Sequence, residues 1–313
     1  GALLYMTVFV PKFGLRGVWI SIFNAVSAFC NAGIDILGPN SLCDYATHPL
    51  INLVTCLLII LGGIGYIVWW DVLRVARSRS RRNRKFFRHL TLQSKIAIVS
   101  TFVLIFGGGF LLLVTEYNNP LTIGNLSPFD KIQVSFFQSV TTRTAGFASV
   151  PQENLTNAGA FTSLIMMVIG GSPVGTAGGI KTVTAVTLLC SALSTIRNKH
   201  QPAIFQRTIS YDSIRKAVAV VCSFLTILLF STIALAACTD APALDILYET
   251  VSATATVGLS RNLTASLNLW GKLVIIATMY FGRVGPISLA VALGSKSESQ
   301  NVISDPEEEI IIG

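Results

Sequence analysis

The sequence predicts an all-α integral membrane protein built from tandem repeats, each with a span, a short helix, a loop and a second span. Composition is the first reason, because 52% of the residues are hydrophobic, only 12% are charged and the mean hydropathy is +0.65. Soluble domains carry about 25% charged residues. Long uncharged segments are the second reason, and three similar motifs at nearly equal spacing are the third.

The uncharged segments have the length of membrane-spanning helices. A helix needs about 20 residues to cross a hydrocarbon core of roughly 30 Å. Residues 2–10 have the composition of the end of a span, and further candidate spans cover residues 51–70, 96–115, 158–180, 217–239 and 273–293. The chain is therefore expected to cross the membrane several times.

The net charge of +8 is concentrated in two linkers between candidate spans. Nine basic residues lie from Arg74 to Lys95 and five from Arg197 to Lys216, whereas the opposite loops are acidic or mixed. The positive-inside rule places both linkers and the C-terminus in the cytoplasm of a multi-pass plasma-membrane protein. A nucleic-acid patch is the alternative, but between spans such a cluster is an orientation signal that also touches anionic lipid. We predict no nucleic-acid partner.

Three short motifs end in glycine at nearly equal spacing. Gly33, Gly146 and Gly258 lie 113 and 112 residues apart, and each follows a small polar residue two positions earlier. The third motif, Thr256-Val257-Gly258-Leu259, is close to the Thr-Val-Gly-Tyr-Gly loop that replaces the hydration shell of the ion in potassium channels. A fixed period indicates one structural unit used several times.

Each motif follows an apolar segment that is too short to cross a membrane, which indicates a re-entrant helix. These segments cover residues 18–29, 128–142 and 243–255. Irregular backbone at membrane depth is tolerated only inside protein or beside a water-filled path, so the motif loops are expected to line a pore. The predicted division is into repeats 1–73, 95–195 and 216–294, cytoplasmic linkers 74–94 and 196–215, and a cytoplasmic tail 295–313.

The motif loops carry candidate ligands for potassium ions. Glycine adopts left-handed backbone angles that can turn carbonyls towards an axis, and such carbonyls can replace the hydration shell of K⁺. A helix C-cap is the alternative for a single glycine, but three glycines at equal spacing favour a filter. The predicted filter residues are Asn31, Ala32, Gly33, Thr144, Ala145, Gly146, Thr256, Val257 and Gly258.

A second glycine series follows the motifs and is enlarged in its middle member. Gly62-Gly63-Ile64-Gly65 and Gly282-Arg283-Val284-Gly285 are short, whereas residues 170–179 contain five glycines and a proline. Glycine costs a helix about 1 kcal/mol and proline about 3 kcal/mol. A kink or a close helix contact is the alternative, but the composition of the middle member favours a flexible loop inside the membrane.

The period also predicts a fourth motif upstream of Gly33. One period before that glycine falls outside this chain. Four two-span units close a pore around an axis, so we expect a pseudo-fourfold pore of which three motif-bearing repeats are present here. The chain is accordingly expected to begin partway through a longer protein.

The motifs resemble those of the superfamily of Trk, Ktr and HKT potassium transporters. The tail from Asp305 to Gly313 looks most like that of the Ktr membrane subunit. The resemblance implies potassium uptake rather than enzymatic activity, K⁺ as the transported ion and no organic cofactor. The matching pieces are Asn31-Ala32-Gly33, Thr142-Arg143-Thr144-Ala145-Gly146-Phe147, Gly178-Gly179-Ile180-Lys181-Thr182, Thr256-Val257-Gly258-Leu259-Ser260 and Gly282-Arg283-Val284-Gly285-Pro286.

The resemblance further implies that the enlarged glycine segment is an intramembrane gate loop. Arg283 aligns with a family arginine that faces this loop, so we predict that loop carbonyls accept hydrogen bonds from Arg283 and keep the gate shut. Lys181 either faces the same cavity and repels cations or extends to the interface. The predicted gate residues are Gly170, Gly171, Ser172, Pro173, Val174, Gly175, Thr176, Ala177, Gly178, Gly179 and Lys181.

Arg143 stands directly beside the second motif, and a buried arginine at membrane depth needs a partner. Glu249 and Asp130 are the candidates, and Arg143 and Glu249 are expected to support the filter from behind. Family membership also implies a homodimer of membrane subunits on a cytosolic ring of nucleotide-binding regulatory subunits. The tail and the basic linkers are the expected contacts with that ring.

Three alternatives remain at this point. A sodium-permeable member of the same family is one, because some relatives carry serine in place of a filter glycine. A secondary transporter of an organic solute would have inverted repeats, whereas the motifs here run in one direction. A membrane enzyme would need convergent ionisable residues in the spans, but His48, His89 and His200 all fall in predicted loops.

Overall fold

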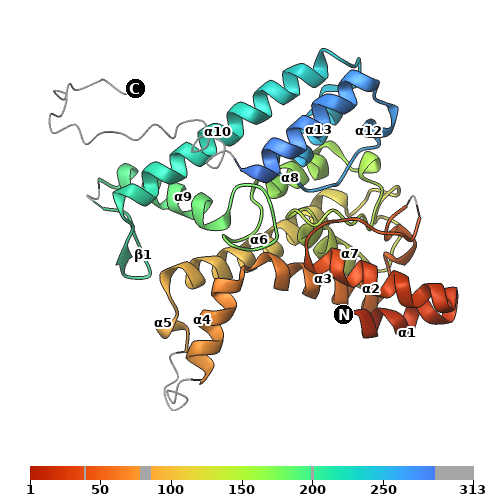
Figure 1. The fold of residues 1–313 in the computed structure, drawn as a ribbon, viewed down its shortest axis with the longest axis horizontal. Helices are drawn as coiled ribbons and strands as arrows, with labels where there is room; N and C mark the ends of the chain where they lie inside the picture. Colours follow the sequence, from red (N-terminus) through yellow and green to blue (C-terminus); the bar gives the residue numbers. More distant parts are fainter. Residues whose placement is uncertain (39, 78–85, 199–200, 286–313) are drawn as a thin grey trace.

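The described part of the chain, residues 1–38, 40–77, 86–198 and 201–285 of the computed structural model, is mostly helical and has almost no strands (Figure 1). This confirms the all-α prediction. The helices are α1 (Ala2–Phe13), α2 (Leu15–Phe29), α3 (Pro49–Gly63), α4 (Tyr66–Arg77), α5 (Phe86–His89), α6 (Leu92–Glu116), α7 (Pro128–Thr141), α8 (Asn157–Val168), α9 (Thr182–Ile196), α10 (Tyr211–Ala236), α11 (Ala243–Thr254), α12 (Leu263–Ser266) and α13 (Leu269–Val284).

The helices fall into three groups along the chain, each with a short second helix. The groups are α1–α4, α6–α9 and α10–α13, and their short second helices are α2, α7 and α11. Helix α2 packs between α1 and α3, α7 packs on α6, and α11 packs between α10 and α13. In Figure 1 the first group (red to orange) and the third group (cyan to blue) lie on opposite sides of the second.

Two described helices, α6 and α10, are long and apolar enough to cross a membrane by themselves. Helices α3 and α4 meet that test only as a pair, and the pair is bent by 93°. The prediction of one continuous span over residues 51–70 is therefore wrong. The bend occurs at Gly65, whose φ is +87°. Only glycine fits there, because a Cβ would lie 2.4 Å from the carbonyl oxygen of Pro173.

The predicted span over residues 158–180 is also interrupted. Helix α8 ends at Val168, an irregular segment follows over residues 169–181, and α9 begins at Thr182. The last predicted span, 273–293, is helical up to Val284. Residues 286–293 of that span, the tail 295–313, residues 78–85 of the first linker and residues 199–200 of the second linker lie outside the described residues.

Polar side chains define where the long helices begin. Thr91 Oγ1 accepts from the Ser94 N–H at the start of α6, and Ser210 Oγ accepts from Ser213 at the start of α10. Ser127 caps α7 in the same way, and Pro128 follows at the first helical position. Such caps satisfy backbone donors that have no partner inside the helix.

The apolar side chains divide between a packed interior and an exposed belt. Tyr5, Phe9, Phe137 and Phe147 lie in one buried cluster that joins the first group to α7. The long helices instead expose large apolar side chains, which is the surface expected of helices in lipid. Examples are Phe102, Phe110, Leu229 and Phe230.

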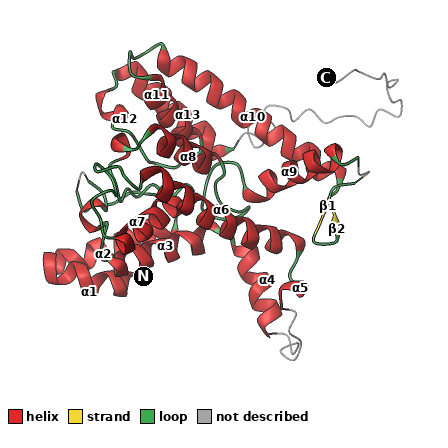
Figure 2. Ribbon diagram, turned by 180° about the vertical axis from the view of Figure 1, so that it is seen from behind, coloured by secondary structure: helices red, strands yellow, loops and turns green. Residues whose placement is uncertain are grey.

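The two basic linkers touch one another. The second linker contains a two-stranded hairpin, β1 (Ala203–Ile204) and β2 (Arg207–Thr208), which the sequence analysis did not predict (Figure 2). The ring of Phe205 in this hairpin lies 5.7 Å from that of Phe87 on α5, edge to face. The two linkers therefore lie on the same side of the molecule.

Candidate ion pathway

The three glycine motifs, far apart in sequence, meet at one place. A Cβ on Gly33 would lie 2.4 Å from the carbonyl oxygen of Ala145, and a Cβ on Gly146 would lie 2.5 Å from that of Val257. The Cβ added to Gly146 would also lie 3.0 Å from Gly33 Cα and 3.5 Å from Gly258 Cα. The second motif loop thus lies between the first and the third, with room for glycine alone at Gly33 and Gly146.

The three motif loops share one backbone conformation. The φ angles are +50° and +66° at Asn31 and Gly33, +69° and +90° at Thr144 and Gly146, and +54° and +95° at Thr256 and Gly258. A left-handed φ is uncommon outside glycine and is an outlier for a β-branched threonine. Its recurrence at the same two positions indicates that the motifs are three copies of one loop.

The first and third motif glycines are not the caps of the preceding helices. After α2 the Ala32 N–H donates to Ser27 O and the Asn31 N–H to Ala28 O. After α11 Val257 donates to Ser252 and Thr256 to Ala253 in the same pattern. This is the Schellman arrangement, in which the left-handed capping residue is here Asn31 or Thr256. The glycine two residues later has a separate role, which disfavours the helix-cap interpretation.

Hydroxyl groups in the last turn of each short helix hold the loop that follows. Ser27 Oγ accepts from the Ile34 N–H at 3.0 Å, and Ser252 Oγ accepts from the Gly258 N–H at 3.2 Å. Thr141 Oγ1 donates to Phe147 O at 2.7 Å. The sequence analysis did not assign these residues, although Ser27 and Ser252 both stand six positions before the motif glycine.

Arg143 is buried, but its predicted partners are wrong. Its Nη2 donates to the carbonyl oxygen of Gly170 at 3.1 Å and to Thr101 Oγ1 at 3.4 Å. Within the described part of the chain it forms no ion pair with Glu249 or Asp130. Both carboxylates already have local partners, since Asp130 binds Ser127 and Glu249 binds residues that follow the third motif.

Glu249 binds the segment that follows the third motif loop. One oxygen of its buried carboxylate accepts from Ser260 Oγ at 2.8 Å and from the Thr264 N–H at 3.1 Å, and also from the Thr264 hydroxyl. These bonds connect α11 to the chain on the far side of Gly258. Arg261, which follows the third motif, forms an ion pair of 2.6 Å with Asp245 of α11 and adds to this connection.

The irregular segment 169–181 lies directly against the motif loops. We call it the intramembrane loop, after the location that the sequence predicts for it. The Gly178 N–H donates to Thr144 Oγ1 at 2.9 Å. A Cβ on Gly178 would lie 2.0 Å from Thr256 Oγ1 and 2.5 Å from Ala255 O. Gly178 therefore sits against the base of both the second and the third motif loops.

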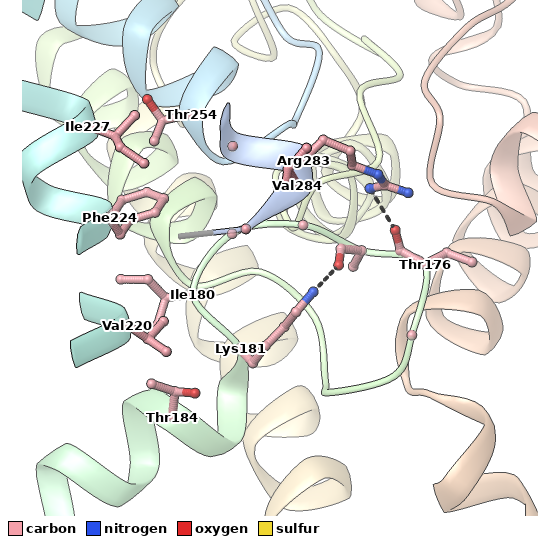
Figure 3. A pocket seen from close by; sticks show the side chains of 16 residues that line it. Thr176, Ile180, Lys181, Thr184, Val220, Phe224, Ile227, Thr254, Arg283 and Val284 are labelled. Carbon is pink, nitrogen blue, oxygen red and sulfur yellow. Dashed lines mark hydrogen bonds between the residues drawn. The ribbon is translucent and has the colours of Figure 1, made fainter. Parts of the chain in front are cut away.

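Two basic side chains, Arg283 of α13 and Lys181 at the end of the loop itself, also bind the intramembrane loop (Figure 3). Arg283 Nη1 donates to the carbonyl oxygen of Thr176 at 3.1 Å, and Lys181 Nζ donates to that of Ala177. The hydrogen bond predicted between Arg283 and the loop is therefore present. Lys181 lines the cavity beside the loop, and its ammonium group donates a hydrogen bond to a loop carbonyl.

The second glycine series packs helices against the short helices. A Cβ on Gly62 would lie 1.8 Å from Phe29 O, the end of α2, and a Cβ on Gly282 would lie 2.2 Å from Thr254 O, the end of α11. The alternative of a close helix contact is thus correct for the first and third members. The middle member forms the irregular loop that its composition predicts.

Two cavities flank this assembly. One of about 450 Å³ lies between the intramembrane loop, α10 and α13, and is lined by Lys181, Phe224 and Arg283 among others (Figure 3). The other, of about 560 Å³, lies between the first and third motif loops, where Asn31 and Thr256 line it. In the described residues no group of histidine, cysteine and carboxylate side chains is arranged to hold a metal ion.

The sequence and fold match a family of known proteins. The family model described as TrkH, cation transport protein, matches residues 5–304. The chain belongs to the TrkH family of cation transport proteins. The resemblance noted from the motifs is therefore confirmed, as is the prediction of a transporter rather than an enzyme.

Curated relatives of this TrkH-family chain are named as uptake proteins. It is 38% identical to the Ktr system potassium uptake protein B of Bacillus subtilis (strain 168) over 313 residues, 100% of this chain and 68% of that protein. It is 38% identical to the potassium/sodium uptake protein NtpJ of Enterococcus hirae over 319 residues, again 100% and 68%. This chain spans about two thirds of the length of these relatives.

A solved structure has the same fold. The potassium transporter TrkH from Vibrio parahaemolyticus superposes with a TM-score of 0.71 at 17% identity, covering 93% of this chain and 62% of that one. At this identity the similarity establishes the TrkH-like fold.

Proposed function

We propose that this TrkH-family chain takes up potassium ions across the cell membrane through a filter of main-chain carbonyls. The observation that carries the proposal is the meeting of three loops with the same pair of left-handed residues. Residues in regular helices and strands have negative φ angles, so three loops with left-handed residues at one place indicate a specialised site. The proposed ligands are carbonyl oxygens of Asn31, Ala32, Gly33, Thr144, Ala145, Gly146, Thr256, Val257 and Gly258.

The electrostatics of the short helices support cation binding at this place. Helices α2, α7 and α11 all end at the motif loops. A helix C-terminus carries a partial negative charge, so three such ends add to the attraction that the carbonyls exert on a cation. Neither effect needs an ionised side chain or an organic cofactor.

The intramembrane loop is the proposed gate. Its contact with Thr144 and Thr256 from below supports a role in obstructing the path of the ion. Arg283 and Lys181, which donate to loop carbonyls, would hold it in the obstructing position. The gate comprises residues 170–179 together with Lys181, as expected from the sequence.

A sodium-permeable transporter is the second candidate, because NtpJ is named as a potassium/sodium uptake protein and is as similar to this chain as the potassium uptake protein is. The three motif glycines described above favour potassium. Competition by sodium ions against potassium uptake distinguishes the two candidates.

The assembly around this pathway is also a proposal. Residues 1–73, 95–195 and 216–294 would be three repeats around a pseudo-fourfold pore, with linkers 74–94 and 196–215 and the tail in the cytoplasm. The contact of Phe87 with Phe205 supports one side for both linkers. A homodimer on a cytosolic nucleotide-binding ring would use that side.

The proposal is tested by potassium uptake in cells that lack uptake systems of their own. Growth at low potassium and uptake of ⁸⁶Rb⁺ should depend on the complete protein that contains this chain. Sodium uptake without potassium uptake would contradict the proposal and favour the second candidate.

Serine at position 258 should weaken ion discrimination. Gly258 has a φ of +95°, a conformation that costs residues with a Cβ about 1–2 kcal/mol. That energy corresponds to roughly tenfold in an equilibrium, so Gly258→Ser should lower the preference for K⁺ over Na⁺ by about this factor. The measurement is ⁸⁶Rb⁺ uptake against increasing Na⁺, and an unchanged preference would argue against a filter role for Gly258.

A further inference from the structure

Two adjacent residues of the second motif loop hold the two ends of the intramembrane loop. Arg143 Nη2 donates to Gly170 O at 3.1 Å, and Thr144 Oγ1 accepts from the Gly178 N–H at 2.9 Å. Both side chains are buried, Arg143 at 7% exposure and Thr144 at 0%. The filter and the gate proposed above are thus attached to each other at one place.

The two ends are also joined to one another. We call Gly170 and residues 178–180 the neck of the intramembrane loop. The Gly170 N–H donates to Ile180 O, and the Ile180 N–H donates to Val168 O, both at 3.0 Å. A Cβ on Gly170 would lie 2.0 Å from Gly178 O. The neck is closed, and the rest of the loop projects from it.

The projecting part, residues 172–177, which we call the tip, has partners in other parts of the chain. The Ser172 N–H donates to Gly63 O at 2.9 Å, and the Thr176 N–H to Gly62 O at 3.2 Å. Thr176 also donates from Oγ1 to Phe29 O and accepts from Arg283. The tip is therefore held by the first and third helix groups, as well as by Thr182 and Lys181 at the start of α9, which bind Ser172 and Ala177, whereas the neck is held by the second motif loop.

The conformation of Thr144 gives the neck contact a consequence for the filter. Its φ of +69° is a strained angle for a β-branched residue, and such angles persist only where the surroundings enforce them. Thr256 occupies the same position in the third loop, but within the described residues its hydroxyl has no hydrogen-bond partner. The bond from Gly178 is a constraint specific to Thr144.

We propose that Arg143 and Thr144 are positioning residues that keep the neck attached to the filter while the tip alone moves to open the path. This inference rests on the proposed function. Release of the tip then changes the rate of uptake and leaves ion preference intact. Release of the neck changes both, because Thr144 belongs to the filter as well as to the attachment of the gate.

The test compares threonine variants of the complete protein. Thr144→Val keeps the shape of the side chain but removes the acceptor for Gly178, whereas Thr144→Ser keeps the acceptor. Thr256→Val makes the same chemical change in the filter without removing a hydrogen bond. The measured quantities are the KM and maximal rate of ⁸⁶Rb⁺ uptake, the inhibition by Na⁺, and the amount of folded protein in the membrane.

Thr144→Val is expected to raise the maximal rate and to lower the preference for K⁺ over Na⁺ by about tenfold relative to Thr256→Val, a change equivalent to about 1.4 kcal/mol. Thr144→Ser should restore both properties towards those of the unaltered protein. Thr176→Val, which loses only the tip bond to Phe29 O, should raise the rate with the ion preference kept.

Equal ion preferences in Thr144→Val, Thr144→Ser and Thr256→Val would overturn the inference, even with an altered rate. If Thr144→Val does not fold, Arg143→Lys and Arg143→Gln take its place, because lysine keeps a donor and a positive charge. Equal ion preferences in these two folded variants would overturn the inference as well. Failure of the proposed function is distinct, since the unaltered protein would then take up no potassium.

Discussion

Replacing Gly146 by alanine is expected to reduce potassium uptake at least about 100-fold, equivalent to roughly 2.8 kcal/mol, while the protein still reaches the membrane. Gly146 lies between the other two motif glycines, and the new Cβ would lie 2.5 Å from Val257 O and 3.0 Å from Gly33 Cα. Both are backbone atoms, which cannot rotate away as a side chain can. The φ of +90° adds strain of its own.

Gly107→Ala is the matched control, because Gly107 lies on α6 and a Cβ there meets nothing within 4 Å. Uptake of ⁸⁶Rb⁺ and the quantity of protein in purified membranes should be measured for both variants. Normal uptake by Gly146→Ala would contradict the convergence of the three loops on the ion path. Equal loss in both variants would point to a general effect of the substitution.

Deleting residues 172–175 is expected to raise the maximal rate of potassium uptake. The deletion removes the bond from the Ser172 N–H to Gly63 O, the acceptor that Val174 O provides for the Tyr66 N–H, and the bond between the Ser172 and Thr182 hydroxyls. Each such bond contributes about 0.5–1.5 kcal/mol net, so losing three of them should increase the rate by at least roughly tenfold. Initial rates of ⁸⁶Rb⁺ uptake at saturating concentration measure the effect.

Arg283→Gln serves as a milder companion to the deletion, since it removes the charge of a side chain that binds Thr176 O and leaves the length of the loop unchanged. It should raise the rate in the same direction by a smaller factor. Arg283→Lys retains the charge and should lie nearer to the unaltered protein. An unchanged or lower rate in a folded deletion variant would argue against a gate at this loop.

The C-terminal ends of the short helices, and the start of α7, were predictable because they carry local signals. Pro128 follows a serine cap at the start of α7, and each helix ends just before a glycine motif. The observed bounds of α2, α7 and α11 differ from the predicted segments by at most three residues at either end. Residue types and segment lengths are enough to predict a helix when its ends are determined by residues that are close in sequence.

The breaks in the longer apolar segments depend on contacts that a hydropathy profile does not contain. At the bend, Gly65 lies against the backbone of Pro173, more than one hundred residues away, where a Cβ would not fit. Arg143 shows the same limit, since the sequence offers carboxylates as partners whereas the structure supplies the carbonyl of Gly170. Main-chain acceptors exist at every residue, so their use is set by tertiary packing alone.

Helix α9 connects the intramembrane loop to the hairpin of the second linker. Its first residue, Thr182, donates to Gly171 O and binds the Ser172 hydroxyl, and its far end contacts the hairpin strand β1. With 15 residues the helix is a rod about 22 Å long. Because a helix of this length is stiff, we expect that a displacement of the hairpin would reach the intramembrane loop through α9, and that a displacement of the loop would reach the hairpin.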